Sequence, residues 1–303
     1  MYQSFTEGYG GACSVYDPPR SPWCSDKFYL ERQFPEMHTR MPSGLDRPYD
    51  HLPNGPYASA NGTHIFAWRP GHWYTWMFEV GLSTIGPNAS DTSFLFSGGG
   101  NQGGEGSDTA GEWFIENVLE ELDAPNEFFF SAEERKLYLY YNGTAALPPS
   151  DVVAPALAQL IAFRGSALAP VRNVSLVDLT FRDTRPTYMD PRGNPSGGDW
   201  ALERSGAIFL EGTRDCSIEA SLFTRLDSNG IFLSGWNRGA QIVGNEFVWL
   251  GQSAIASWGL LDGDTNSGLG GEQPRGTRIA ANWCHEIGHI QKQSSFYFQV
   301  TSR

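Results

Sequence analysis

Short apolar segments recur in the last part of the chain with one fixed pattern. Segments of the same form begin at Val174, Cys216, Ala240 and Thr277, each with apolar residues two and seven places after its first residue. A second apolar segment follows each of them. Because alternate residues of a strand face opposite sides, the pattern places one set of side chains inside a tube and the other set outside.

The spacing of these rows identifies the kind of repeat. The rows begin 42, 24 and 37 residues apart, and the two long intervals contain loop-like insertions at 183–200 and 260–275. Strands that repeat every ~20–25 residues with polar corners are typical of a solenoid. A leucine-rich repeat needs an L-x-x-L-x-L frame and a helix in each turn, and neither is found. We predict an all-β, right-handed parallel β-helix (solenoid) with inserted loops, in which Ile218, Ile242 and Ile279 share one column.

Two asparagines occupy equivalent positions in successive rows. Asn245 and Asn282 share a column of the alignment, and we expect their amides to stack as a ladder at one corner. The alternative is that they are unrelated turn asparagines, since Asn is common in turns.

The repeat divides the chain into two predicted domains. Residues 1–104 form an irregular, β-rich N-terminal region with a disulfide loop, and residues 105–303 form the β-helix. Within them we expect a short helix or turn at 112–122 and a hairpin at 128–141. The last row has no capping element, so we predict truncation at the C-terminal end and homo-oligomer or fibre assembly through open ends.

Composition restricts the partners. The formal net charge of −13 disfavours nucleic acid, and it disfavours an acidic glycan unless a basic groove or bridging cations offset the field. Ten tryptophans suit either a core or stacking against sugar rings. Hydrophobic runs are too short to span a membrane. The first residues lack the basic and apolar regions of a signal peptide.

Other features nevertheless favour secretion. Cys13 and Cys24 bracket a Pro-rich turn and are predicted to form a disulfide, whereas Cys216 and Cys284 are expected to be buried thiols. Four N-x-[ST] sequons predict glycosylation. They begin at Asn61, Asn88, Asn142 and Asn173.

Several segments carry a family resemblance. Residues 112–125, 137–141, 196–212 and 292–299 resemble right-handed parallel β-helix repeat proteins of the pectin-lyase-like fold. The resemblance covers roughly 105–303. It implies a substrate groove along one flat parallel face and its flanking loops, and an activity such as glycoside hydrolysis or polysaccharide lysis. The same fold also hosts epimerases, adhesins and inert modules.

Carboxylates near that face are the candidate catalytic groups. Asp227 precedes a strand, with Arg204 at the matching position one coil below, and Glu203 and Glu211 within reach because coils lie ~4.8 Å apart. Two carboxylates at about 5–10 Å suffice for glycoside hydrolysis. An adjacent Arg204 would keep Asp227 ionised. The alternative is that 226–230 is an ordinary turn, in which Asp bonds to local backbone.

Further residues are predicted to bind substrate. They are Asp199 and Trp200 on the first insertion, with Arg204, Trp258 and Lys292. Asp262 and Asp264 have a spacing compatible with Ca²⁺, but the rest of a calcium loop is missing, so a solvated acidic loop is the preferred interpretation. We expect no other cofactor.

One motif points to a different chemistry. His285-Glu286-Ile287-Gly288-His289 matches the zinc-protease pattern H-E-x-x-H. That chemistry needs both histidines on one face of a helix and a third ligand. Here the motif falls at a corner of the repeat, and Gly288 is a poor helix former. We therefore predict no metal site, and favour a secreted glycoside hydrolase-like enzyme acting on a neutral polysaccharide. The alternative is a non-catalytic structural or adhesive module of an extracellular assembly.

Overall fold

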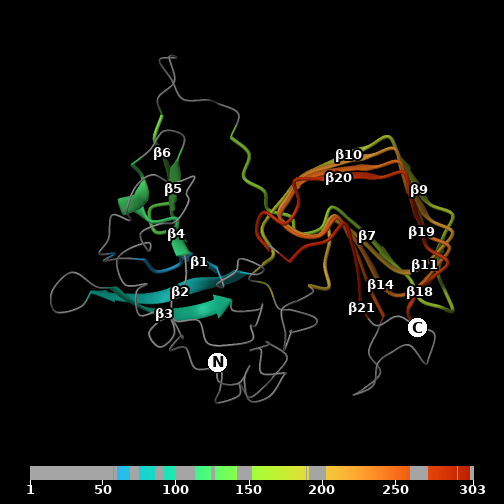
Figure 1. Cartoon of the computed structure of the whole chain (residues 1–303), viewed down its shortest axis with the longest axis horizontal. Coiled ribbons are helices and arrows are strands. Elements are labelled where there is room, and N and C mark those ends of the chain that lie inside the picture. Colours follow the sequence, from blue (N-terminus) through green and yellow to red (C-terminus); the bar gives the residue numbers. More distant parts are fainter. Residues whose placement is uncertain are drawn as a thin grey trace. The chain divides into compact units, whose positions relative to one another are not determined.

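The computed structural model describes eleven parts of the chain, which are residues 57, 60–68, 75–85, 92–99, 113–123, 127–141, 152–188, 190, 203–259, 272–291 and 293–300. The chain divides into two compact units. Met1–Val152 with Met189–Leu202 forms the first, and Val153–Tyr188 with Glu203–Arg303 forms the second (Figure 1). The predicted domain boundary at 104/105 and the predicted Cys13–Cys24 disulfide lie outside the described residues. No helix among the described residues is long and apolar enough to cross a bilayer.

The described part of the first unit contains an antiparallel sheet and a hairpin. The sheet has the strand order β3-β2-β1-β4. The strands are β1 His64–Trp68, β2 Thr75–Ile85, β3 Thr92–Gly99 and β4 Trp113–Glu116. The predicted hairpin is confirmed as β5 Phe128–Ser131 paired with β6 Lys136–Leu139.

The segment with helical spacing at 112–122 forms a strand followed by one 3-10 turn. β4 ends at Glu116, and Asn117 follows it with a left-handed φ of 61° before η1, Leu119–Glu121. Ile115 and Val118 are both buried in this arrangement. The apolar spacing is therefore satisfied without an α-helix.

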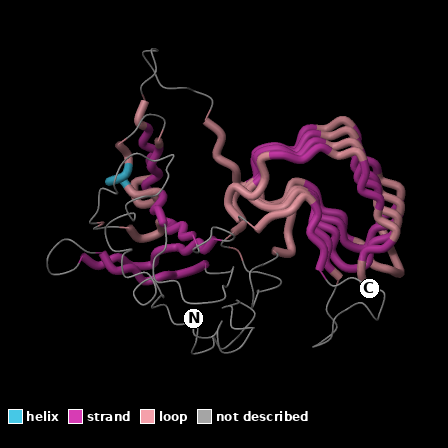
Figure 2. Tube along the Cα trace, viewed as in Figure 1, coloured by secondary structure: helices cyan, strands magenta, loops and turns pink. Residues whose placement is uncertain are grey.

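The second unit is a parallel β-helix, which confirms the predicted fold class. Each coil passes through three parallel sheets, and Figure 2 shows the strands of successive coils lying side by side around one tube. Sheet I contains β7 Ile161–Arg164, β11 Ile208–Arg214, β14 Ile231–Arg238, β17 Ile255–Trp258 and β21 Tyr297–Val300, with β8 Val171–Arg172 and β18 Pro274–Arg275. Sheet II contains β9 Ser175–Val177, β12 Ser217–Glu219, β15 Gln241–Val243 and β19 Arg278–Ala280. Sheet III contains β10 Thr180–Thr184, β13 Leu222–Leu226, β16 Glu246–Leu250 and β20 Trp283–His285.

The apolar columns lie where the repeat predicts them. Ile218 pairs with Ile242, and Ile242 with Ile279, in the registers of sheet II. In sheet III the rings of Phe181 and Phe223 have centroids 4.9 Å apart, and those of Phe223 and Phe247 are 4.7 Å apart. These side chains belong to one buried apolar cluster inside the coils.

The predicted asparagine ladder is present at the corner between sheets II and III. The Asn245 amide nitrogen donates to Ile218 O at 2.9 Å and to Asn282 Oδ1 at 3.0 Å. Asn245 Oδ1 accepts from the Ser221 N–H at 3.0 Å, and Asn282 Nδ2 donates to Ile242 O at 2.9 Å. Backbone groups that the turn leaves unpaired are thus satisfied between coils.

Left-handed residues mark three corners of every described coil, with φ between 47° and 69°. The column between sheets I and II is Asn173, Asp215, Gly239 and Gly276; the column between sheets II and III is Asp178, Ala220, Gly244 and Ala281; the column near the end of sheet III is Asp183, Arg225, Trp249 and Glu286. The third column holds no glycine, although this conformation is costly for residues with a Cβ. It fixes the directions of charged and aromatic side chains at one edge of the solenoid.

Candidate functional site

The predicted site residues fall into three groups in the structure. Asp199, Trp200 and Lys292, with Asp262 and Asp264, lie outside the described residues. Glu203 is buried, and Glu211 with Arg204 and Trp258 lies on the outer side of sheet I. Asp227 lies at the turn that follows sheet III.

Glu203 belongs to a buried polar cluster. Its side chain accepts hydrogen bonds from Thr187 Oγ1 at 2.6 Å and from Gln252 Nε2 at 2.8 Å. Glu203 is only 3% exposed, and both partners are buried as well. A carboxyl group in this environment holds the three segments together and offers little access to a polymer.

Glu211 and Arg204 are linked through a serine on the outer side of sheet I. Ser234 Oγ donates to Glu211 Oε2 at 2.6 Å, and Arg204 Nη1 donates to Ser234 Oγ at 2.7 Å. The Arg204 guanidinium lies 4.0 Å from the centre of the Trp258 ring, and Trp258 is only 1% exposed. Leu210 and Leu233 point into the core, so the predicted alternation of this sheet holds. The Arg204 side chain extends along the outer face of sheet I and covers the Trp258 ring.

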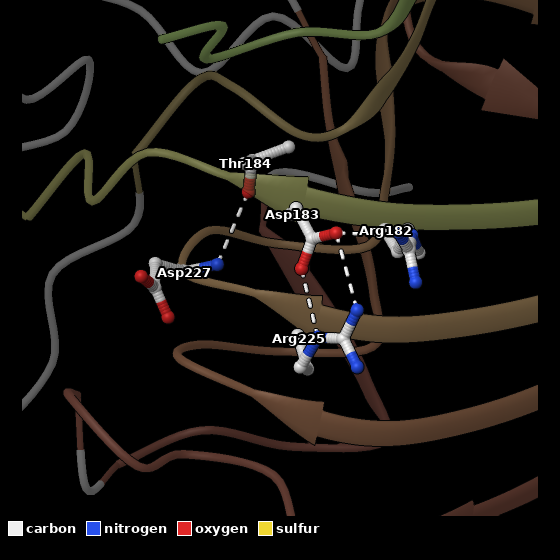
Figure 3. A network of polar contacts seen from close by, with 5 residues as sticks. All are labelled: Arg182, Asp183, Thr184, Arg225 and Asp227. Atoms are coloured by element: carbon white, nitrogen blue, oxygen red, sulfur yellow. Dashed lines mark hydrogen bonds and ion pairs between the residues drawn. The ribbon is translucent and has the colours of Figure 1, made fainter. Parts of the chain in front are cut away.

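Asp227 has different neighbours from those expected. Its backbone N–H donates to Thr184 Oγ1 at 3.1 Å, one coil away (Figure 3). Burial raises the pKa of the Asp227 carboxyl, His289 opposes this rise, and the charge of Asp183 adds to it. The expectation that Arg204 keeps Asp227 ionised is therefore not supported, because Arg204 is committed to the face of sheet I.

Asp183 lies in the preceding coil and has the opposite electrostatic environment. It accepts two hydrogen bonds from Arg225, from Nε at 2.8 Å and from Nη2 at 3.2 Å, and it lies 3.0 Å from Arg182 Nε. The hydrogen bonds from Arg225 are the main cause of a lowered pKa for the Asp183 carboxyl. Figure 3 shows the Asp227 carboxylate directed away from the Asp183–Arg225 pair. Two carboxyl groups of neighbouring coils thus have pKa values shifted in opposite directions.

An exposed aromatic ring continues the same edge. Trp249 occupies the column of Asp183 and Arg225, is 53% exposed, and stacks on the His289 imidazole with centroids 5.2 Å apart. A large exposed indole next to polar groups is a suitable platform for the apolar face of a sugar. We call this set the Asp227 edge; it consists of Asp183, Arg225, Asp227, Trp249 and His289.

Most of the Asp227 edge was missed in the sequence. Asp183, Arg225 and Trp249 stand one position before the apolar column that includes Leu226 and Leu250, so the row alignment contains the signal. The signal is hard to recognise, because the residue in this column changes from an acid to a base to an aromatic residue.

The zinc-protease motif does not form the required helix. Trp283–His285 is strand β20, and bends follow it. His285 stacks on Trp283 with centroids 4.4 Å apart and lies 3.4 Å from Glu246 Oε1, whereas His289 stacks on Trp249. Within the described ranges, no group of three or more His, Cys, Asp or Glu is placed to hold a metal ion.

The remaining predicted modification sites are only partly described. Asn61 and Asn173 are exposed, and Asn88 and Asn142 lie outside the described residues. Cys216 and Cys284 are free thiols; Cys216 is buried and Cys284 half-buried. Burial raises the pKa of Cys284 to about 11, so this thiol stays protonated at neutral pH.

Comparisons with known proteins agree with the architecture. No family model matches the sequence, and no curated protein matches it. A solved structure described as "Glycoside hydrolase" superimposes with a TM-score of 0.61 at 15% identity, over 84% of this chain and 51% of that one. The chain therefore spans about half the length of that protein and is similar to it in fold.

Proposed function

We propose that the chain is a carbohydrate-active enzyme that hydrolyses a neutral polysaccharide at the Asp227 edge. The observation that carries this proposal is the placement of Asp227 and Asp183 in neighbouring coils at one edge, where burial raises the pKa of the Asp227 carboxyl and Arg225 lowers the pKa of the Asp183 carboxyl. Glycoside hydrolysis needs one protonated and one ionised carboxyl group. A glycoside hydrolase with a similar fold supports the same reaction class.

The proposed reaction assigns a role to each group. Asp227 donates its proton to the glycosidic oxygen as the bond from that oxygen to the anomeric carbon breaks. Asp183 remains ionised and stabilises the positive charge that develops on the sugar ring. Water adds to the anomeric carbon, and the proton it releases restores Asp227. Trp249 supplies a stacking surface for a neighbouring sugar.

The choice of Asp183 as the second carboxylate departs from the sequence prediction. Glu203 is buried, with Thr187 and Gln252 bound to it. Glu211 accepts a hydrogen bond from Ser234 but is only half-buried, so it is more accessible than Glu203. It is therefore the alternative to Asp183 as the second carboxylate.

The experiment measures the release of reducing ends from a panel of neutral polysaccharides. Asp227→Asn is expected to lower kcat by about 10²-fold or more, the usual contribution of a positioned general acid. Asp183→Asn and Glu211→Gln identify the second carboxylate. Asp178→Asn, at another left-handed corner, is the matched control and should retain activity.

The test also separates the enzyme from a non-catalytic module. If the wild-type chain releases no product from any glycan and Asp227→Asn binds as tightly as the wild type, the hydrolase proposal fails. The buried outer face of sheet I around Ser234 and Trp258 is what favours this alternative.

We further propose secretion and glycosylation at Asn61 and Asn173. Both side chains are exposed and both sequons are intact. A mass decrease after enzymatic deglycosylation of the chain made in a eukaryotic secretory host tests this, and Asn173→Gln should remove one glycan. No mass change would contradict it.

A further inference from the structure

One arginine stands at the same position in four consecutive coils. The strand registers pair Arg214 with Arg172, Arg214 with Arg238, and Arg238 with Arg275. Neighbouring parallel strands are separated by about 4.8 Å, so the four residues form a straight, evenly spaced row along the solenoid. We call this set the arginine row; it consists of Arg172, Arg214, Arg238 and Arg275. It lies at the end of sheet I, next to the corner that leads to sheet II.

The row is on the outside of the coils. Thr213 and Asn237, which precede two of its members, are both fully buried, and alternation directs the arginines to the other side. Arg172 and Arg275 are exposed, and Arg214 and Arg238 are half-buried. The row is therefore accessible at both ends and partly covered in the middle.

An indole ring holds the middle of the row in place. The guanidinium of Arg238 lies 4.7 Å from the centre of the Trp236 ring, and that of Arg214 lies 5.5 Å from it. Arg238 Nη1 also donates to Gln273 O at 2.7 Å and to Asn237 O at 2.8 Å. Guanidinium groups fixed in this way lose less conformational entropy when they bind an anion.

Among the described residues, few carboxylates balance the positive charge of Arg172, Arg214 and Arg275. Within the described residues, Arg172, Arg214 and Arg275 form no ion pair with a carboxylate. The pKa of Arg238 is lowered by burial and by the like charges of Arg275 and Arg214, with Glu272 acting in the opposite direction. A ligand carrying an equally spaced row of negative charges would relieve this repulsion.

We propose that the arginine row binds one linear anionic polysaccharide, with its carboxylate or sulfate groups aligned along the solenoid axis. Arginine forms paired hydrogen bonds with both groups. The even spacing favours a polymer over a single small anion, and a single line of charge fits one extended chain. The net charge of −13 opposes nucleic acid, whose charge density is high on every side.

This site is independent of the proposed hydrolysis. The composition alone disfavours an acidic glycan unless basic residues offset the field, and the arginine row supplies such residues. It lies at the opposite end of the sheet I strands from the turn that contains Asp227. Binding at the row and cleavage at the Asp227 edge can therefore be tested separately.

The test is a binding titration of the whole chain with a carboxylated glycan, a sulfated glycan and a neutral glycan. Binding is measured by calorimetry at two salt concentrations. We expect the anionic glycans to bind, more weakly at high salt, and the neutral glycan not to compete for the row. The double variant Arg172→Gln/Arg275→Gln should weaken binding about tenfold or more, since charge-assisted hydrogen bonds at two residues are lost.

The control removes the same charge elsewhere. Arg135→Gln/Lys136→Gln lies on the β5–β6 hairpin of the first unit and should leave the affinity unchanged. Equal loss in both double variants would show general attraction to charge and overturn the proposal. Equally tight binding of a DNA duplex would overturn the assignment to a glycan, and binding that survives Arg172→Gln/Arg275→Gln would remove the row as the site. The relative affinities of the two anionic glycans decide between carboxylate and sulfate.

Discussion

At the scale of single residues, the carboxyl group of Asp227 connects stability with chemistry. Burial raises its pKa, so the folded state favours the protonated form more than the unfolded chain does. The protonated Asp227 carboxyl stabilises the folded protein fully below the pKa that Asp227 has in the unfolded chain. This stabilisation is lost as pH rises through the pKa of Asp227 in the folded protein. A half-buried acid of this kind costs stability at neutral pH, and such a cost is often found at catalytic positions.

Asp227→Asn should therefore raise the melting temperature at pH 7. Asparagine is neutral at every pH, so the ionisation that destabilises the wild type is removed. The difference should shrink as pH falls and vanish near pH 3, where both side chains are uncharged. Thermal unfolding followed by circular dichroism at several pH values measures it.

Asp183→Asn is the matched comparison, with the opposite sign. The lowered pKa of Asp183 stabilises the folded protein above the unfolded value, and this stability is lost as pH falls through the folded pKa. The variant should be less stable than the wild type at pH 7 and equal to it in acid. The same sign for both variants would contradict the electrostatic description of the edge.

The pH dependence of the proposed hydrolase activity should reflect the protonation of both Asp227 and Asp183. The rate falls on the alkaline side as Asp227 loses its proton and on the acid side as Asp183 gains one. A bell-shaped profile of kcat/KM, whose alkaline limb disappears in Asp227→Asn, is the expected result. An unchanged alkaline limb would assign the acid role to another residue.

Asp227 was predicted from the sequence, but its partners were not. The turn at 226–230 was visible because Asp, Asn and Gly cluster there. The direction of Arg204 was not predictable, because a long side chain can reach Trp258 two coils away as readily as the residue beside it. Asp183 and Trp249 were missed because their column changes from Asp to Arg to Trp, so no residue type repeats in it.

At the scale of elements, the coils depend on contacts that repeat from one strand to the next. The asparagine ladder was predictable, because shared columns in a solenoid become vertical neighbours. The left-handed corners were predictable only where Gly, Asn or Asp occupy them. Ala220 and Ala281 show that the stack imposes the conformation against local preference.

Asn245→Ala should destabilise the β-helix by about 2–4 kcal/mol, since several buried hydrogen bonds are lost and their backbone partners remain. Asn245 is 2% exposed and bonds to both neighbouring coils. Denaturant unfolding of the whole chain measures the effect. Asn173→Asp, at an exposed left-handed corner that Asp tolerates, is the control and should change stability by less than about 1 kcal/mol. Equal effects would show that the ladder contributes nothing beyond the turn.

At the scale of the whole molecule, the solenoid makes stability nearly additive along its axis. Each coil contacts the coil before it and the coil after it, so a side chain has two sets of neighbours in the interior. The column Ile218–Ile242–Ile279 was predicted from sequence because its period is strict. Two domains were also predicted, with a boundary at 104/105 that lies outside the described residues.

The Ile218–Ile242–Ile279 column allows the same substitution to be compared in two different coils. Ile242 is 1% exposed between Ile218 and Ile279, whereas Ile279 is half-buried. Ile242→Ala should cost about 3–4 kcal/mol through lost burial and the cavity left behind. Ile279→Ala should cost about half as much, because fewer atoms surround it. Since side chain, strand type and register are the same, the ratio measured by denaturant unfolding isolates the contribution of stacking. Equal losses of unfolding free energy would mean that contacts within each coil set the stability. Stacking between coils would then contribute little.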